Sequence, residues 1–174
     1  MTIYQDDRVL IRTMQDSDPQ ALFEAVKREG WHADLDCDRM RLQDHRSGKC
    51  TALMAEVEGA LAGHIYVYRH AIDGPEAYRA LPEIVDFGVF PAFRQQGVGT
   101  ALMDAAENIA AGWAEEVCLG VGLHNGYGSA QRMYVKRGYI PDGSGAWYHG
   151  QVCGQYEPCC NDDDLVLYFS KALR

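Results

Sequence analysis

A strand that runs into a helix through a glycine turn constrains this chain more than any other stretch of its sequence. Residues 84–90 are rich in β-branched and aromatic residues and stop at Pro91, which predicts a strand. From Val98 onward, apolar residues recur at helical spacing. Gly97 and Gly99 stand where this helix begins, so backbone N–H groups can approach an anion that the helix dipole favours. The segment is either a phosphate-binding turn or a plain tight connection.

Two common phosphate motifs do not fit this turn. No G-K-[ST] follows the glycines, as a Walker loop requires, and the third glycine of the Rossmann fingerprint is missing. What remains is R-x-x-G-x-G, in which Arg94 adds a planar cation beside the turn. Placed after a strand that ends in V-x-P, this motif resembles the pyrophosphate-binding motif of the GNAT superfamily of N-acetyltransferases. The resemblance implies that acetyl-coenzyme A (acetyl-CoA) is the cosubstrate and that the turn holds its pyrophosphate.

The same resemblance implies a set of residues that hold acetyl-CoA. The pantetheine amides are expected to pair with the strand backbone at Phe87 and Val89, and an N–H near Val89 is expected to receive the oxyanion. Asn125 stands where the family often places an asparagine that bonds the pantetheine arm or the next helix, although Asn125-Gly126 is also an ordinary turn dipeptide. The predicted cofactor-binding residues are Phe87, Val89, Arg94, Gln95, Gln96, Gly97, Val98, Gly99, Thr100 and Asn125.

The size and charge of the chain narrow the classes of function. With 174 residues, 47% of them hydrophobic, we expect one GNAT-like domain spanning residues 1–174. No apolar run approaches the roughly 20 residues that cross a bilayer, and the first residues lack the features of a signal peptide, so we expect a cytoplasmic protein. The formal net charge of −9 disfavours binding to nucleic acid or to an anionic membrane.

The cysteines are expected to be thiols, and no metal is predicted. Because the sequence shows no secretory signal, we expect a reducing compartment in which the six cysteines stay as thiols. Cys153, Cys159 and Cys160 cluster downstream of His149, which is a set of donors that zinc accepts. The chain has no C-x2-C pair, however, and two adjacent cysteines suit a tetrahedral site poorly.

The predicted elements follow an α+β order. The pattern predicts helices up to residue 28, from residue 98 and at 130–137, and a short helix near 35–42, with strands at 9–13, 50–57, 61–69, 84–90, 117–123, 146–152 and 165–170. This order resembles that of the GNAT fold, which implies a mixed, mostly antiparallel sheet of six to seven strands flanked by about four helices.

Tyr134 is the candidate general acid. Acetyl transfer from a thioester releases a thiolate, and a nearby tyrosine can protonate it because the pKa of a thiol is roughly 8 to 9. Residues 130–139 resemble the GNAT segment A-x-x-x-Y-x-x-x-G-[FY], whose tyrosine is the usual acid. A tyrosine on an amphipathic helix is otherwise ordinary core packing.

The acceptor amine must also lose a proton, because an aliphatic amine has a pKa near 10. Glu83 begins the motif strand and resembles in position the glutamate base of the histone-acetylating branch; otherwise it is an exposed strand-end charge. Asp86 and ordered water are the rivals. Period-two alternation places Asp86 on one face of the strand and Glu83 on the other, together with Val85, Phe87 and Val89. At most one of the two carboxylates then points directly into a given cleft.

The acceptor is suggested by charge alone. The acidic residues 161–164 precede the last strand, where they either attract a cationic amine or form a solvated loop, and Trp147, Tyr148 and His149 could line the same pocket. We predict an N-acetyltransferase that moves an acetyl group to a primary amine, with a small cationic amine favoured, by direct transfer in a ternary complex.

Two alternatives and one assembly question stay open. The chain could be an acyl-CoA-binding module with little turnover, or an acetyltransferase that acts on a protein N-terminus or a lysine. Exposed final strands could also pair two copies into a homodimer.

Overall fold

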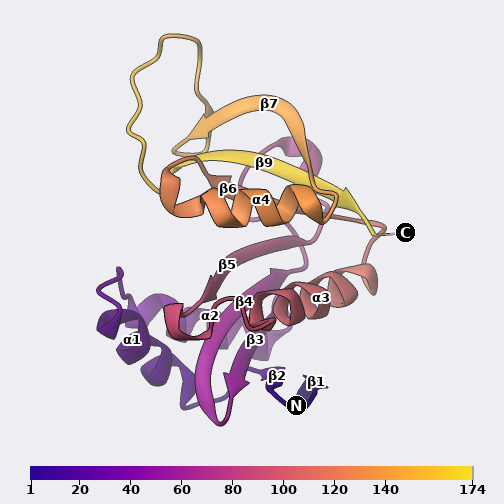
Figure 1. Ribbon diagram of the computed structural model, residues 1–174. Coiled ribbons are helices and arrows are strands. Elements are labelled where there is room, and N and C mark those ends of the chain that lie inside the picture. Colours follow the sequence, from indigo (N-terminus) through magenta and orange to yellow (C-terminus); the bar gives the residue numbers. More distant parts are fainter. Residues whose placement is uncertain (174) are drawn as a thin grey trace. The chain divides into compact units, whose positions relative to one another are not determined.

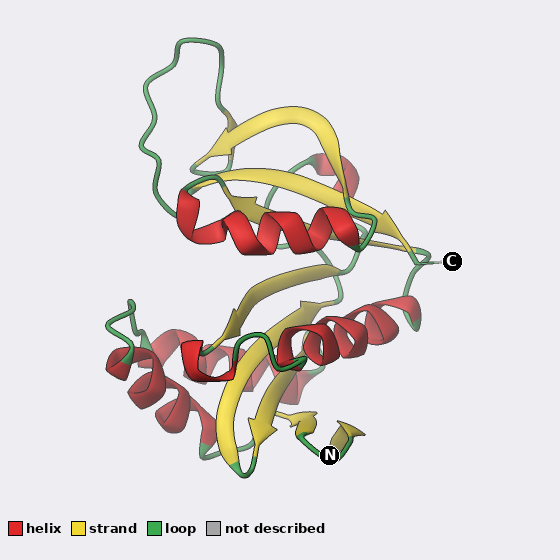
Figure 2. Cartoon of the chain, in the orientation of Figure 1, coloured by secondary structure: helices red, strands yellow, loops and turns green. Residues whose placement is uncertain are grey.

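The computed structural model describes residues 1–173 and has an α+β fold, as predicted (Figures 1 and 2). The elements follow in the order β1 (Thr2–Gln5), β2 (Val9–Thr13), α1 (Asp18–Arg28), α2 (Leu35–Ser47), β3 (Cys50–Val57), β4 (Ala60–Tyr68), η1 (Glu76–Tyr78), β5 (Glu83–Val89), η2 (Pro91–Phe93), α3 (Val98–Ala111), β6 (Glu116–Gly122), η3 (Asn125–Tyr127), α4 (Gly128–Lys136), β7 (Ile140–Tyr148), β8 (Gln151–Val152) and β9 (Leu165–Ala172).

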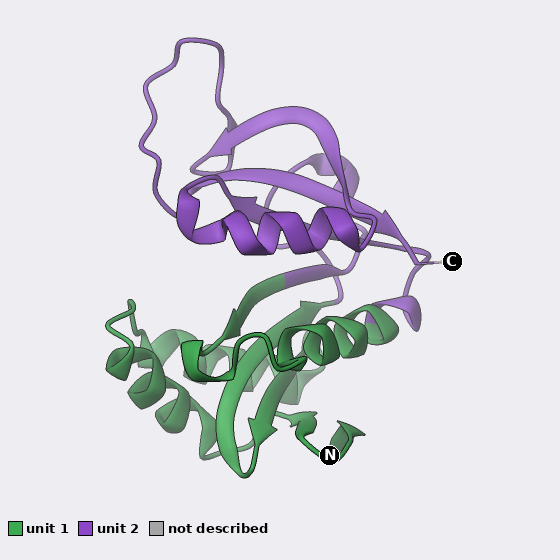
Figure 3. Cartoon of the chain, viewed as in Figure 1, with its two compact units in different colours: residues 1–68, 85–109 green, residues 69–84, 110–174 purple. Residues whose placement is uncertain are grey.

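Contacts along the chain divide it into two compact units (Figure 3). The first unit holds Met1–Tyr68 and Val85–Ile109, and the second holds Arg69–Ile84 and Ala110–Arg174. Strand β5 is shared, because Glu83 and Ile84 belong to the second unit and the rest of the strand to the first. A single domain therefore stays a prediction.

The first unit has helices on both faces of its strands. Its strand order is β1-β2-β3-β4-β5, with antiparallel pairing from β1 through β4. On β4, Tyr66 packs in a cluster with Leu42 of α2. Gly63 is on the opposite face, where a Cβ would lie 3.2 Å from Leu102 of α3. Alternation along β4 thus places α2 and α3 on opposite faces (Figure 1).

The second unit also has helical segments, η1 and α4, packed against its strands. Its strand order is β5-β6-β9-β7-β8, with β5 parallel to β6 and the β6–β9, β7–β9 and β7–β8 pairs antiparallel. Tyr168 of β9 packs with Tyr78 of η1 and Cys118. On α4, the Gln131 side chain donates a hydrogen bond of 2.7 Å to the carbonyl of Gly122 at the end of β6. The predicted mixed, mostly antiparallel sheet is confirmed.

Three predicted elements differ from the structure. The sheet has nine strands rather than six to seven, partly because β1 was not predicted. The strand expected at residues 146–152 was wrong: His149 and Gly150 have φ of 49° and 75°, and a turn with two positive φ values folds the chain into the β7–β8 hairpin. Helix α2 is longer than the expected 35–42; Asp34 caps it by accepting from the N–H of Asp36 and of Cys37.

A buried ion pair joins the start of α1 to the sheet and carries a stability prediction. Asp18 is 4% exposed, pairs with Arg12 at 2.6 Å and accepts a bond of 2.6 Å from the backbone N–H of Gln15. Asp18→Asn should lower the free energy of unfolding by about 2 kcal/mol, because it removes one of the two carboxylates that pair with Arg12 and leaves only Glu56, whose Oε1 lies 2.6 Å from the guanidinium. Urea denaturation measures this loss.

The matched control is Asp16→Asn, two residues away. Asp16 also pairs with an arginine, Arg46, but its side chain is 83% exposed. The control should change stability by less than about 1 kcal/mol. If both variants lost the same free energy of unfolding, the result would contradict the claim that burial makes the Arg12–Asp18 pair important for stability.

Candidate active site

Strand β5 carries a backbone irregularity at Asp86. Its φ is +48°, in the left-handed region that aspartate tolerates better than most residues. Val85 packs against the cluster that contains Tyr66, and Asp86 pairs with Arg41 of α2, so two consecutive side chains contact the α2 side of the sheet. The predicted alternation was therefore wrong at this point: Val85 does not share a face with Phe87 and Val89.

Beyond Asp86 the strand alternates again and meets the glycine turn. A Cβ built on Gly99 would lie 3.3 Å from Cζ of Phe87 and 3.6 Å from Cγ2 of Val89. On the other face, a Cβ on Gly88 would lie 2.8 Å from the ring of His64. The structure thus brings Phe87 and Val89 against the start of α3, and a Cβ at Gly99 would require the Phe87 ring to shift by a few tenths of an ångström.

The turn itself has the backbone of an anion-binding nest. Gln95 and Gly97 have φ of +60° and +87°, and the Gln96 between them does not have a positive φ. Such alternation points successive N–H groups into one concavity. Gly97 also begins the helix, because its carbonyl accepts from the N–H of Ala101 at 3.0 Å. The first-turn N–H groups, those of Val98, Gly99 and Thr100, have no partner within the helix and can face an anion.

Arg94 is held beside this turn by groups that the sequence did not identify. Its Nε donates to the carbonyl of Val89 at 3.0 Å, and its guanidinium lies 5.7 Å from the ring centre of Trp31. Trp31 in turn stacks on Phe90 with ring centres 5.7 Å apart. No sequence motif marks Trp31, since it follows α1 in a segment without periodicity.

A pocket of about 570 Å³ opens beside Gly97 within the first unit. Thr100 and Asp104 of α3 line one side, and Tyr4 and Arg8, from the β1 and β2 region, line the other. A pocket of this size accommodates a nucleoside-sized group next to the anion-binding nest. The pocket therefore adjoins the glycine turn, because Gln96, Gly97 and Thr100 also line it.

The two candidate bases have different surroundings. Glu83 is 5% exposed, and its Oε2 accepts a hydrogen bond of 2.8 Å from the backbone N–H of Ile72. The alternative that Glu83 is an exposed strand-end charge was wrong. The side chain of Asp86 is 49% exposed and is paired on one side with Arg41, which leaves it accessible.

Tyr134 lies in the second unit on α4. It is 6% exposed, and its ring meets that of Tyr139 edge-on with centres 5.6 Å apart. Burial raises the pKa of Tyr134 above the usual value for a phenol. Its hydroxyl therefore remains protonated throughout the neutral pH range and can serve as a proton donor.

Asn125 is exposed and begins η3. Its backbone carbonyl accepts from the N–H of Gly128, and the neighbouring His124 ring accepts from the N–H of Gly126 at 3.0 Å. The structure thus gives this segment the geometry of a turn that leads into α4. A bond from the Asn125 side chain to a cofactor stays a prediction.

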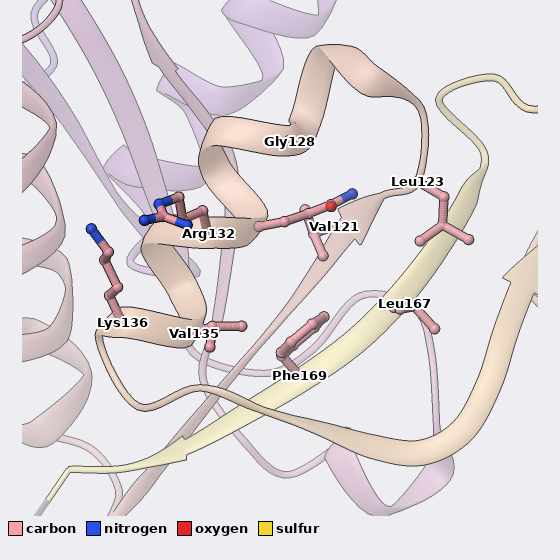
Figure 4. Close-up of a pocket in the computed structure, with 9 residues that line it drawn as sticks. Val121, Leu123, Gly128, Arg132, Val135, Lys136, Leu167 and Phe169 are labelled. Atoms are coloured by element: carbon pink, nitrogen blue, oxygen red, sulfur yellow. The ribbon is translucent and has the colours of Figure 1, made fainter.

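A second pocket, of about 500 Å³, lies beside α4 within the second unit (Figure 4). Val121 of β6 and Phe169 of β9 form its apolar part, and Arg132, Val135 and Lys136 border it from the helix. Tyr134 is not among the residues that line it. Two cations beside an apolar floor suit a ligand with both an apolar and an anionic part.

The acidic loop before β9 is largely paired within its own unit. Asp163 contacts His124 at 3.0 Å and accepts from the Tyr127 hydroxyl at 2.9 Å. Asp164 contacts His149 at 3.2 Å. Trp147, by contrast, packs edge-on against Tyr168. The Tyr148 hydroxyl also donates to Asp162 at 3.4 Å, so Tyr148 and His149 both contact this loop, whereas Trp147 does not lie with them.

Two further observations apply to residues 1–173. No helix in this range is long and apolar enough to cross a membrane. No group of three or more histidine, cysteine, aspartate or glutamate side chains in the same range is arranged to hold a metal ion.

Comparison with known proteins identifies the family. The sequence profile described as the Acetyltransferase (GNAT) family matches residues 11–139, which is most of the chain. The chain belongs to the GNAT family of acetyltransferases. The predicted resemblance is confirmed. The prediction that the chain is an acetyl-CoA-dependent N-acetyltransferase is confirmed with it.

Solved structures share the fold of this GNAT chain at low sequence identity. Salmonella typhimurium yncA, solved with acetyl-CoA, has a TM-score of 0.69 and 16% identity over 97% of this chain and 95% of its own. The Salmonella typhimurium acetyltransferase that modifies the N-terminal serine of ribosomal protein L7/L12 has a TM-score of 0.72 and 13% identity, with 99% of both chains covered. Ard1 of Thermoplasma volcanium has a TM-score of 0.66 and 19% identity over 95% and 97%. A search of curated proteins finds no match.

Proposed function

We propose that this GNAT acetyltransferase binds the pyrophosphate of acetyl-CoA at residues 94–100 and transfers the acetyl group directly to a primary amine. The observation that carries the proposal is the nest at Gln95 and Gly97 at the start of α3, packed against Phe87 and Val89. It offers N–H groups and a helix dipole to an anion, and an adjacent extended backbone to the pantetheine amides. Backbone N–H groups and the helix dipole can therefore stabilise the negative charge of the pyrophosphate without a cationic side chain.

Tyr134 is proposed as the acid that protonates the leaving thiolate. The proton moves from the Tyr134 hydroxyl to the thiolate sulfur, which gives the free thiol of CoA and a phenolate that regains a proton before the next turnover. Asn125, three residues before α4, is proposed to bond the pantetheine arm.

Asp86 is the better candidate for the carboxylate that receives the amine proton. It is half exposed and fixed by Arg41, whereas Glu83 is buried and already accepts from the N–H of Ile72. A base must reach the proton it removes, directly or through one water. Glu83 with a water relay stays the alternative.

Direct transfer is favoured over an acetylated enzyme. Burial raises the pKa of Cys37 and raises that of Cys50 to about 11, and both cysteines interact with Arg41, so their thiolate content is low. A thiol that is rarely ionised is a poor nucleophile towards a thioester. The acceptor amine then attacks acetyl-CoA in a ternary complex.

The acceptor is proposed to be a small cationic amine. A net charge of −9 and the accessible Asp86 both favour a cation. A protein N-terminus is the second candidate, because similar folds include an acetyltransferase that modifies the N-terminal serine of L7/L12. Homodimer formation also stays a proposal, and the roles proposed for the site residues do not depend on it.

Thiol release from acetyl-CoA tests the proposal against a binding module. Wild-type protein should release free CoA with at least one member of a panel of monoamines, polyamines, aminoglycosides and peptides. We expect kcat of about 1 s⁻¹ or higher for the best acceptor. Tight binding of CoA without thiol release for any acceptor would support the binding module instead.

A further inference from the structure

Helix α2 turns a polar side towards the sheet. Leu42 is its only buried residue, and the side chains that face β4 include Arg41 and Asp44. The Arg41 guanidinium lies 5.3 Å from the ring centre of Tyr66 and 5.1 Å from that of Tyr68. Amphipathic helices normally bury an apolar stripe, so burying these polar groups costs free energy unless they are hydrogen-bonded or paired.

Arg41 is fixed from several directions and itself fixes Asp86. Its Nη1 donates to the Tyr68 hydroxyl at 2.7 Å, and that hydroxyl donates to Asp44 at 2.8 Å. Its Nη2 donates to Asp86. The Arg41 side chain is 11% exposed, whereas that of Asp86 is 49% exposed. A buried cation on two aromatic rings thus holds a carboxylate at the protein surface.

The hydrogen-bond network in this cluster is incomplete within residues 1–173. The Tyr66 hydroxyl, Nε of Arg41 and Nδ1 of His64 are buried there without a hydrogen-bond partner. Tyr66 is 1% exposed, and its hydroxyl lies within the electrostatic influence of Asp38, Asp86 and Arg41. Unused buried polar atoms are rare in proteins, and three in one cluster indicate a group that comes from outside the chain.

We propose that Asp38 and Asp86 bind the ammonium group of the acceptor, with Arg41 as the positioning residue for Asp86. This inference rests on the proposed function and names the acceptor side of the same reaction. Asp38 lies one helical turn before Arg41 on α2, and Asp86 pairs with Arg41, so two carboxylates adjoin one cation and the subsite has a net negative charge. It should favour an amine without an adjacent carboxylate over the matching amino acid.

Asp38 gives this subsite a pH signature. Burial, with Asp34 and Asp86 adding to it, raises the pKa of Asp38 to about 6. The charged and titratable groups that interact electrostatically with Asp38 are Asp34, Cys37 and Arg41 of α2 and its cap, Tyr66 of β4 and Asp86 of β5; His64 of β4 interacts with Arg41 and Asp86. Burial lowers the pKa of His64 to about 4 and raises those of Cys37 and Tyr66, so these three do not titrate near pH 6.

The sign of the pH effect follows directly. Below pH 6 Asp38 is protonated and loses its attraction for an ammonium ion, whereas the amine itself is cationic throughout this range. The kcat/KM for the amine should therefore fall as the pH drops through about 6. The KM for acetyl-CoA should not follow this curve.

Asp38→Asn tests the proposal, with Asp36→Asn as its matched control. Asp36 lies on the same helix but its side chain is 92% exposed, and it pairs only with Arg39. Asp38→Asn should raise the amine KM about tenfold or more, remove the fall near pH 6 and leave the KM for acetyl-CoA unchanged. Asp36→Asn should change neither. An amine KM within about twofold of wild type in Asp38→Asn would overturn the inference.

Arg41→Lys and paired substrates test the other two elements of the proposal. Lysine keeps the charge but not the fork that contacts Asp86 and Tyr68 together, so the amine KM should rise several-fold with kcat less affected. Phenethylamine should be acetylated with a higher kcat/KM than phenylalanine, and cadaverine with a higher value than lysine. A preference for the amino acids would contradict a net negative subsite.

Failure of this inference can be told apart from failure of the proposed function. If wild-type protein releases no CoA thiol with any amine, the proposed function fails and calorimetric binding of cadaverine still tests the subsite. If wild type turns over and Asp38→Asn retains the same KM and pH profile, only the subsite fails.

Asp38→Asn should also stabilise the protein. A carboxylate whose folded pKa lies above its unfolded value destabilises the fold once the pH exceeds both values. Allowing for partial exposure, the variant should melt about 2–4 °C higher at pH 7 and match wild type below about pH 4. A lower Tm at pH 7 would contradict the raised pKa of Asp38.

Discussion

Gly97→Glu should abolish measurable acetyl-CoA binding in a protein that still folds. Gly97 has φ of +87°, and a Cβ there would meet nothing within 4 Å, so a side chain enters open space at a cost of about 1–2 kcal/mol for the left-handed backbone. The glutamate carboxylate then occupies the mouth of the nest and repels the pyrophosphate. We expect affinity, measured by calorimetry, to fall by about 100-fold or more.

Gly97→Ala separates charge from backbone strain. It imposes the same left-handed cost without a carboxylate, so its affinity for acetyl-CoA should fall by about tenfold at most. Far-ultraviolet circular dichroism of both variants checks that they fold. Retention of wild-type affinity by Gly97→Glu would overturn the assignment of this turn to the pyrophosphate.

Tyr134→Phe should remove most of the catalytic rate and little of the binding. The substitution keeps the ring that packs against Tyr139 and removes only the hydroxyl, so the fold should be retained. Loss of a general acid typically lowers kcat by about 10²–10⁴-fold. Steady-state kinetics should show that loss in kcat, with the KM for acetyl-CoA changed by less than about threefold.

Tyr139→Phe is the matched control for this experiment. Tyr139 is buried, 2% exposed, and forms the other half of the same ring pair, but it follows α4 rather than lying on it. It should retain kcat within about threefold of wild type. Equal losses in both variants would indicate packing as the cause, and an unchanged kcat in Tyr134→Phe would exclude the acid role.

Local chemistry made the donor side of the site predictable. A change from strand to helix period is visible in the sequence, and glycines at 97 and 99 have few uses there other than a left-handed turn and close packing. The structure provides both uses, at Gly97 and Gly99 respectively. The end of α4 was predictable for the same reason, since Gly138 has φ of +90° directly after it.

The acceptor side could not be predicted in this way. The extent of α2 is hidden because the helix packs with charged residues where periodicity predicts apolar ones. The left-handed backbone at Asp86 breaks an alternation that the sequence appears to continue, and no glycine marks the position. Arg41, His64 and Tyr66 are far apart in the sequence from Asp86, and only tertiary packing brings them together.

The central claim is that acetyl-CoA bound at the glycine turn passes its acetyl group directly to an amine. Rapid mixing of wild-type protein with acetyl-CoA, first alone and then with the best acceptor, tests it most directly through the release of free CoA. The account predicts no CoA release before the amine is added, then release matched by acetylated amine. A burst of CoA equal to the enzyme concentration without amine, or no release after its addition, would contradict it.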